Sequence, residues 1–354
     1  MLSQSKSKSS ESEITETQDI STMSQTSSEK KADFFSRLPE EILKVNIIET
    51  VGSQTIATTL ARTCKGHHLF FDEELKIGRH ALLLVNHVAR GEQEQAEELL
   101  DALKNIQDIR KGVLSYKIKF TDIAGKQFIK PITAFQYAVW ALDRHMYEML
   151  GNYLSDDQAR AQLEELDREG VDYIKPASRI GEIERKAQPI KKERQFNLST
   201  LIDALRTYSY CLWNNQFSDD SQQVNFWKNE VGIAQRDLPA HVVNEYCRPD
   251  RSFFPTPRFD EKILPRETKF FNNTDNQNRT EDWFTHASPI GKSCAILRAN
   301  SPKSAVAAKG PSVVQQGFID RDVAALESLS AQRLEDRLML SIELSPPLKK
   351  ISHK

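Results

Sequence analysis

The sequence lacks any long apolar stretch. A helix that crosses a bilayer takes about 20 consecutive apolar residues, and the longest aliphatic run, residues 81–85, covers only about one helical turn. The N-terminus is rich in Ser, Lys, Glu and Thr and has no apolar core of the kind found in classical export signals. We therefore expect no transmembrane segment and a cytoplasmic protein.

Cysteine is scarce, with four among 354 residues, and no two of them form a CxxC pair. So few cysteines in a chain of this size do not make a disulfide scaffold. His67 and His68 stand together, but no second pair of metal-ligand residues lies nearby, so we predict no metal site. The cysteines, which we interpret as reduced thiols, are Cys64, Cys211, Cys247 and Cys294.

Neither charge sign is in excess, and no catalytic signature is readable. The chain has 48 basic and 50 acidic residues, a net charge of −2, so it has no global field that would favour nucleic acid as a partner. The glycine-rich phosphate loops, the GxSxG elbow and the HExxH zinc motif are all missing. We therefore predict no catalytic residues and no cofactor.

Residues 1–32 have no aromatic residue and consist mainly of Ser, Thr, Glu, Gln and Lys. Such a composition buries too little apolar area to offset the entropy of ordering the backbone, so we expect a disordered tail. Beyond it, apolar residues recur with helical spacing, which predicts a mainly α-helical fold. The segments predicted to be helical include 81–90, 92–103, 133–142, 144–154, 199–213 and 318–344.

Three other segments lack this helical periodicity. Residues 175–195 are polar and basic, which indicates a connector. Residues 224–297 combine tryptophan and phenylalanine with many prolines, so we expect an irregular but ordered region. Residues 298–317 are predicted to be a linker, followed by a C-terminal helix and tail over 318–354.

Three short motifs together resemble an F-box. Residues 38–42 read Leu-Pro-Glu-Glu-Ile, residues 60–65 read Leu-Ala-Arg-Thr-Cys-Lys, and residues 69–70 read Leu-Phe. The resemblance covers about residues 33–75 and implies a three-helix unit that docks onto the Skp-type adaptor of a cullin–RING ubiquitin ligase. The plain alternative is an ordinary amphipathic helix with proline in its first turn. The predicted adaptor-binding residues are Leu38, Pro39, Ile42, Leu43, Ile47 and Leu60.

Downstream, residues 133–138 read Thr-Ala-Phe-Gln-Tyr-Ala and are similar to the opening of an ankyrin repeat. The helical pair at 81–103 also looks like an ankyrin pair, so we expect ankyrin-like hairpins over 76–155. The combination resembles F-box and ankyrin-like effectors that intracellular bacteria inject into host cells by type IV secretion. That resemblance implies delivery into the host cytosol.

These readings lead to one functional hypothesis and one alternative. The hypothesis is an F-box-type adaptor that links the ligase to a target protein, held by residues 156–297. The alternative is an effector enzyme, a transferase or a cysteine-dependent hydrolase, with its site in residues 224–297, in a pocket where Cys247, His241 or Asp250 would converge. Aromatic and arginine side chains are enriched in binding faces. The predicted target-binding residues are Trp227, Tyr246, Arg248, Arg251, Phe253 and Trp283.

Overall fold

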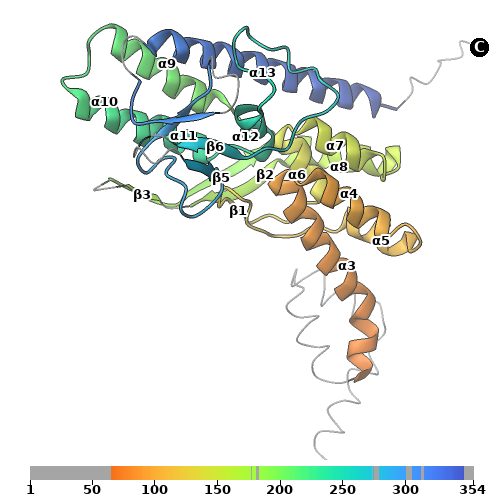
Figure 1. The fold of residues 1–354 in the computed structure, drawn as a ribbon. Coiled ribbons are helices and arrows are strands. Elements are labelled where there is room, and N and C mark those ends of the chain that lie inside the picture. Colours follow the sequence, from red (N-terminus) through yellow and green to blue (C-terminus); the bar gives the residue numbers. More distant parts are fainter. Residues whose placement is uncertain are drawn as a thin grey trace, which may run out of the picture. The chain divides into compact units, whose positions relative to one another are not determined.

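The chain divides into two compact units, Met1–Leu75 and Lys76–Lys354. The computed structural model (Figure 1) describes residues 65–176, 178–180, 183–272, 274, 279–299, 305–311 and 315–346. The six predicted adaptor-binding residues, between Leu38 and Leu60, lie outside these ranges. No helix in the described part of the chain is long and apolar enough to span a membrane. The fold set out below is that of the second unit.

The first part of the second unit is helical. Its helices are α3 (Lys65–Arg90), which begins in the first unit, and α4 (Gln93–Ala102), α5 (Gln107–Ser115), α6 (Ala134–Ala141), α7 (Arg144–Gly151) and α8 (Asp156–Glu169). Local capping explains the boundaries of α6, since the Thr133 hydroxyl accepts the Gln136 N–H while the Gln136 side chain accepts the Thr133 N–H. Asp143 caps α7 in turn by accepting the Met146 N–H.

A three-stranded antiparallel sheet follows, in the order β1-β2-β5. Its strands are β1 (Gln127–Phe128), β2 (Val171–Lys175) and β5 (Gln188–Glu193), and the short strands β3 (Ser178–Ile180) and β4 (Ile183–Arg185) pair with each other. The prediction of a polar connector over 175–195 is therefore wrong. In β5 only Ile190 and Glu193 are even partly buried, so this edge strand lacks the apolar alternation that identifies a strand.

The last part of the unit surrounds a second, four-stranded sheet in the order β7-β6-β9-β8. Its strands are β6 (Lys269–Asn272), β7 (Arg279–Asp282), β8 (Ala295–Leu297) and β9 (Val306–Ala308). Strands β6 and β9 run parallel, while the other two pairs are antiparallel. The helices are α9 (Ser199–Trp213), α10 (Asp220–Phe226), the π-helical segment η2 (Trp227–Val231), α11 (Gly232–Arg236), α12 (Ala240–Cys247) and α13 (Gln316–Glu343).

The two sheets overturn the predicted fold class. A mainly α protein of helical hairpins with an irregular proline-rich region was expected, whereas the described residues form a mixed α/β structure. The predicted linker at 298–317 contains β9, the central strand that pairs with both β6 and β8. The strands of the four-stranded sheet are three or four residues long, too short for a period of two to be recognised in the sequence.

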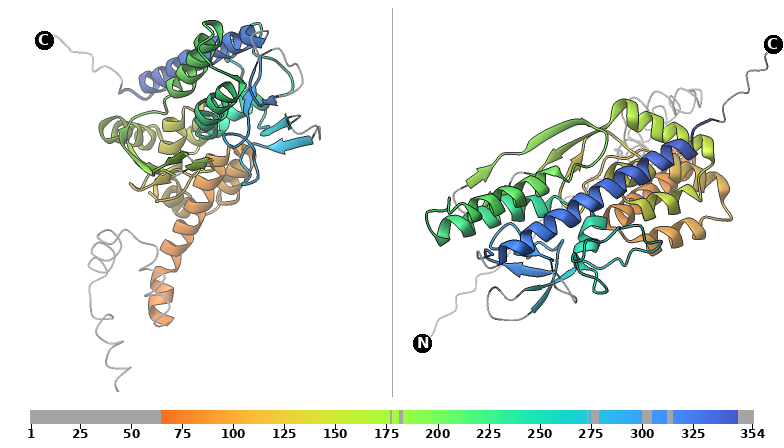
Figure 2. Two further views of the ribbon diagram at one scale, coloured as in Figure 1. Left: turned by 90° about the vertical axis from the view of Figure 1, so that its left-hand side faces the viewer. Right: turned by 90° about the horizontal axis from the view of Figure 1, so that it is seen from above.

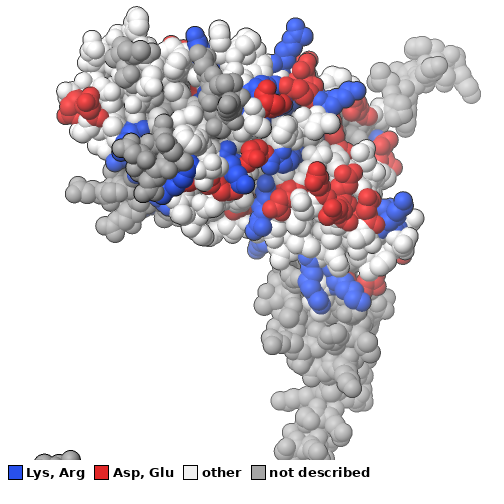
Figure 3. All heavy atoms as spheres, in the orientation of Figure 1, with Lys and Arg blue, Asp and Glu red and all other residues white. Residues whose placement is uncertain are grey.

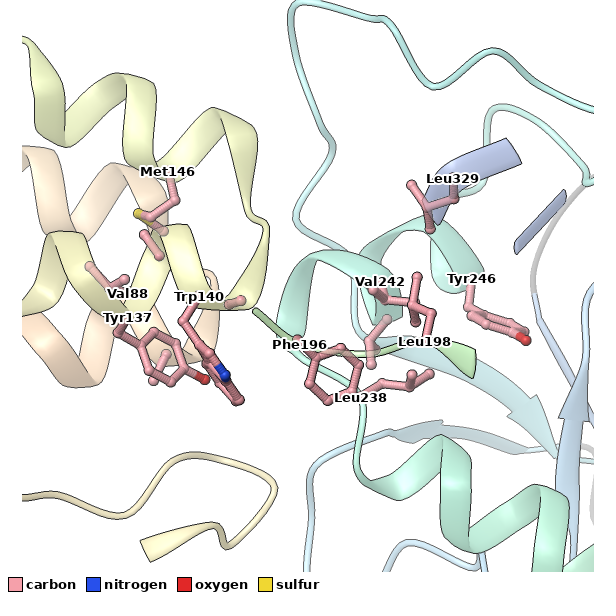
Figure 4. Packing of buried hydrophobic residues seen from close by; sticks show 14 of the residues in the cluster. Val88, Tyr137, Trp140, Met146, Phe196, Leu198, Leu238, Val242, Tyr246 and Leu329 are labelled. Atoms are coloured by element: carbon pink, nitrogen blue, oxygen red, sulfur yellow. The ribbon is translucent and has the colours of Figure 1, made fainter. Parts of the chain in front are cut away.

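One hydrophobic core runs through the second unit. Figure 4 shows it extending from Tyr137 and Trp140 on α6, through Phe196, to Val242 and Tyr246 on α12. The long helix α13 packs beside α9, as Figure 2 shows from above. The core therefore passes without a break through the predicted ranges 76–155, 156–297 and 318–354, so its helical and sheet-containing parts are packed as one body.

Candidate functional site

A cluster of buried ion pairs surrounds α12. The Glu245 carboxylate, with a fully buried side chain, accepts hydrogen bonds from Arg248 at 3.3 Å and from Arg251 at 2.5 Å. The Arg333 guanidinium of α13 lies 3.5 Å from the other Glu245 oxygen and donates to Asp336 at 2.8 Å. Buried charges are tolerated when they neutralise one another in this way, so the cluster ties α12 to α13.

Five of the six predicted target-binding residues lie in or near this region, mostly below the surface, whereas Trp227 packs against Tyr208 of α9. Four of the six are aromatic and no more than 2% exposed: Trp227, Tyr246, Phe253 and Trp283. The Tyr246 ring packs against Phe253 at 5.1 Å and against Trp283 at 5.5 Å, measured between ring centroids. Arg248 is also buried, and the Arg251 side chain is 18% exposed. In this structure the four rings build the core and offer no contact area to a partner.

The residues named for the enzyme alternative do not form a nucleophilic pair. Cys247 stands six positions after His241 on α12, about 240° further around the helix axis. Burial raises the pKa of the Cys247 thiol well above its usual range and lowers the pKa of His241 to about 3. A thiolate–imidazolium pair needs the opposite shifts. The Asp250 carboxylate is held by Arg248 at 2.7 Å.

A groove lies over one face of the three-stranded sheet. Its larger cavity, of about 610 Å³, is bounded by β2, β5, α9, α11, the turn at 123–125 and the segment 284–292. A second cavity, of about 320 Å³, continues along β5 to Leu198. Both cavities are lined by Lys175, Gln188, Thr200, Ala234 and Asp237, so they adjoin each other, and we call the pair the sheet groove. Its larger part has the volume of a typical ligand pocket.

Backbone geometry explains why one sheet face forms the groove floor. Tyr173 and Lys175 alternate along β2 and so point to the same side. Their register partners on β5 are Ile190 and Gln188, and all four residues line the groove. At the entry to β2, Gly170 has a φ of +64°, and a Cβ there would lie 2.4 Å from a backbone atom of Lys192. Only glycine lets β2 and β5 approach this closely.

The sheet groove carries more positive than negative charge. Its basic residues are Lys175, Lys186, Arg236 and Lys292, and its acidic residues are Glu193, Glu230 and Asp237. Asp237 pairs with Lys175 at 3.2 Å, and its backbone carbonyl accepts a hydrogen bond from the buried Lys126. Lys292 donates to a backbone carbonyl, which leaves its charge uncompensated. Two further cations of the lining, Lys186 and Arg236, form no ion pair with any described residue. Anionic groups are therefore the complementary ligands.

Charge is unevenly spread over the rest of the surface. Figure 3 shows acidic side chains gathered over α4, where all the carboxylates are exposed: Glu94, Glu97, Glu98 and Asp101. A net charge near zero therefore coexists with local differences in charge, such as the acidic cluster on α4 and the small positive excess in the lining of the sheet groove.

Within the described residues no group of three or more His, Cys, Asp or Glu side chains could hold a metal ion.

Sequence reasoning did not find the sheet groove. Its lining comes from segments as far apart as 123–125, 186–190, 230–238 and 284–292, which only the fold brings together. The single available signal was the basic run at 185–194, interpreted as a solvated connector. That run contributes Lys186 to the groove lining from a position just before β5.

Two comparisons with known proteins find relatives. The uncharacterized protein CBUA0006 of Coxiella burnetii (strain RSA 493 / Nine Mile phase I) is 34% identical over 330 residues, which cover 90% of this chain and 91% of that protein. The family model for the CBUA0006 C-terminal domain matches residues 200–344. No solved structure matches the chain. The matched domain supplies α9, α11 and the segment 284–292, while β2 and β5 precede it, so the sheet groove lies where the two parts meet.

Proposed function

The chain belongs to the family of the Coxiella burnetii protein CBUA0006, and we propose that in this member the family's C-terminal domain is the target-holding half of an F-box-type adaptor. Residues 33–75 would bind the Skp-type adaptor of a cullin–RING ubiquitin ligase of a host cell. Residues 76–346 would hold the protein to be modified. Delivery into the host cytosol by type IV secretion is part of the same proposal and rests on the resemblance of the motifs.

The division of the chain between Leu75 and Lys76 carries this proposal. The F-box-like motifs end at residue 70, and the segment that resembles an F-box ends at the same boundary as the first compact unit. Helix α3 (Lys65–Arg90) crosses this boundary, so the two units are distinguished by their contacts and not by a linker. A docking unit needs an apolar face that meets a partner rather than the core of the neighbouring unit.

The continuous core of the second unit is the other support. Two binding sites on one chain raise the effective concentration of each partner at the other, and a well-packed body preserves that gain better than a loose one. The electrostatics of α12 favour this account over the enzyme alternative, because the Cys247 thiol stays protonated and the His241 imidazole stays neutral.

Replacing Leu38 and Pro39 by alanine tests the docking unit. We expect the full-length Leu38→Ala/Pro39→Ala variant, carrying an affinity tag in a eukaryotic lysate, to co-purify at least tenfold less Skp-type adaptor than the unmodified chain. The physical reason is that the leucine and the proline would begin the proposed docking helix. Quantitative immunoblotting of the adaptor gives the measurement.

A matched control changes the same two residue types in the second unit. Leu338 is 60% exposed on α13 and Pro346 is exposed just after it. The Leu338→Ala/Pro346→Ala variant should retain the adaptor at the level of the unmodified chain. Equal recovery of the adaptor with both double variants would rule out docking through residues 38–39.

A further inference from the structure

The sheet groove has the shape of a binding site for an extended segment. It follows β5, whose six residues span about 20 Å at the usual rise of a strand. Its two cavities share Lys175 and Gln188 in their linings, so only an elongated ligand can contact both. A length of this kind accommodates about six residues of extended peptide, whereas a compact small molecule would fill one cavity only.

The charges along the sheet groove select the chemistry of that segment. Lys186, Arg236 and Lys292 have no carboxylate partner among the described residues. Two of the three carboxylates of the lining are engaged within the fold: Asp237 pairs with Lys175, and Glu193 accepts a hydrogen bond from the Trp140 indole at 2.9 Å. The third, Glu230, is exposed. A ligand with carboxylate groups would supply the missing negative charge.

Apolar residues share the lining with these cations. Ile123, Ile233 and Phe284 face the larger cavity, and Ile190 and Phe196 face the smaller one. Such a mixture is typical of polypeptide grooves, where apolar contact provides affinity and a few charges fix the register. A free phosphate or another small anion makes no use of this apolar surface.

We infer that the sheet groove binds an extended, acidic segment of the target protein. This inference deepens the proposed adaptor function and rests on it for the identity of the ligand. It assigns the target-holding surface to residues of β2, β5, α9, α11 and the segment 284–292 instead of the buried aromatic residues around α12.

Fluorescence polarisation with fluorescein-labelled hexaglutamate tests the inference on the full chain. We expect binding by the unmodified protein, no binding of labelled hexalysine, and weaker binding of triglutamate because it spans half of the groove. The Lys186→Glu/Lys292→Glu variant should raise the Kd for hexaglutamate at least tenfold. Both lysines are exposed, so their reversal leaves the core unchanged.

The matched control reverses two exposed lysines outside the groove. Lys104 and Lys262 form no ion pair with a described residue, and the Lys104→Glu/Lys262→Glu variant has the same net charge as the groove variant. Its Kd should stay within about twofold of the unmodified value, because the effect depends on position and not on long-range charge. Equal losses of affinity in the two variants would overturn the inference.

Competition experiments separate the other classes of ligand. If millimolar inorganic phosphate displaces hexaglutamate completely, the groove is a small-anion site, and if a single-stranded RNA hexamer competes better than unlabelled hexaglutamate, it is a nucleic-acid site. Either result contradicts the inference. The adaptor function fails separately, because co-purification of the Skp-type adaptor depends on Leu38 and Pro39 and peptide binding does not.

Discussion

Replacing Trp140 by alanine is expected to lower the free energy of unfolding by about 3–5 kcal/mol, the usual cost of removing a buried tryptophan. The Trp140 side chain is fully buried on α6. Its ring packs against Phe128 of β1 at 5.1 Å, against Tyr173 of β2 at 5.5 Å and against Phe196 at 5.8 Å. Its loss would open a cavity where the helical part meets the three-stranded sheet.

Trp213 is the natural comparison for this experiment. It also stands on a helix, at the end of α9, but 70% of its surface is exposed. Trp213→Ala should change the free energy of unfolding by less than about 0.5 kcal/mol. Urea denaturation followed by far-UV circular dichroism measures both variants. A loss of similar size for the two substitutions would contradict the core described above.

The pH dependence of stability is expected to be small in the unmodified protein because two buried groups act in opposite directions. Burial raises the pKa of Asp322 on α13 from 3.8 to about 7. Between these values the unfolded chain loses the proton first, so stability falls as pH rises. Burial lowers the pKa of His241 from 6.5 to about 3. Here the unfolded chain gains the proton first, so stability falls as pH drops.

Between pH 4.5 and 6.5 each group contributes about 3 kcal/mol, of opposite sign. Asp322→Asn should therefore leave a protein that gains stability by that amount as pH rises from 4.5 to 6.5. His241→Leu should leave one that loses stability over the same range, partly offset by His145, whose pKa is also lowered by burial. Asp143 does not interfere, since its pKa of about 2 places its effect below pH 4.

Urea denaturation at pH 4.5, 5.5 and 6.5 gives the measurement. The sign of the slope is the informative quantity, because either substitution also changes stability at every pH. Asp322→Asn, for example, removes a carboxylate oxygen that accepts one of the backbone N–H groups of Arg298 and Ala299. Two variants with parallel pH profiles would show that the titration of these groups does not govern stability.

Several helices were predictable from the sequence because local chemistry determines them. The expected helices at 133–142 and 144–154 correspond to α6 and α7, where Thr133 and Asp143 supply the caps. The expected helix at 199–213 matches α9 in full. In each case apolar residues recur with helical spacing over at least two turns, so the signal is contained within the segment itself.

The strands were not predictable because their stability comes from distant partners. β9 pairs with β6, which lies about 35 residues earlier in the chain. No local pattern within residues 298–317 indicates this pairing. Arg298 reads as a surface residue in the sequence, yet it is 1% exposed and donates to the Arg248 backbone carbonyl at 2.7 Å. Tertiary contacts override local polarity at such positions.

The candidate site, too, was only partly predictable from the sequence. Five of the six residues chosen within 224–297 come together near α12, and Trp227 packs against α9 instead. Aromatic side chains occur both in cores and in binding faces, and arginine is also enriched in binding faces. Composition could not decide between these roles for Tyr246 or Phe253. Lys186 and Lys292, which face one groove, stand more than 100 residues apart, and only the fold reveals their proximity.

The position of α13 has a consequence for synthesis of the chain. Its buried residues Ile319, Leu326 and Leu329 complete a core that also contains Trp140. A ribosome adds roughly 5–20 residues per second, so on the order of ten to forty seconds pass between the appearance of Trp140 and that of Leu329. Throughout this interval the nascent chain lacks the final helix that covers part of its apolar core, so the core cannot be completed before synthesis is almost finished.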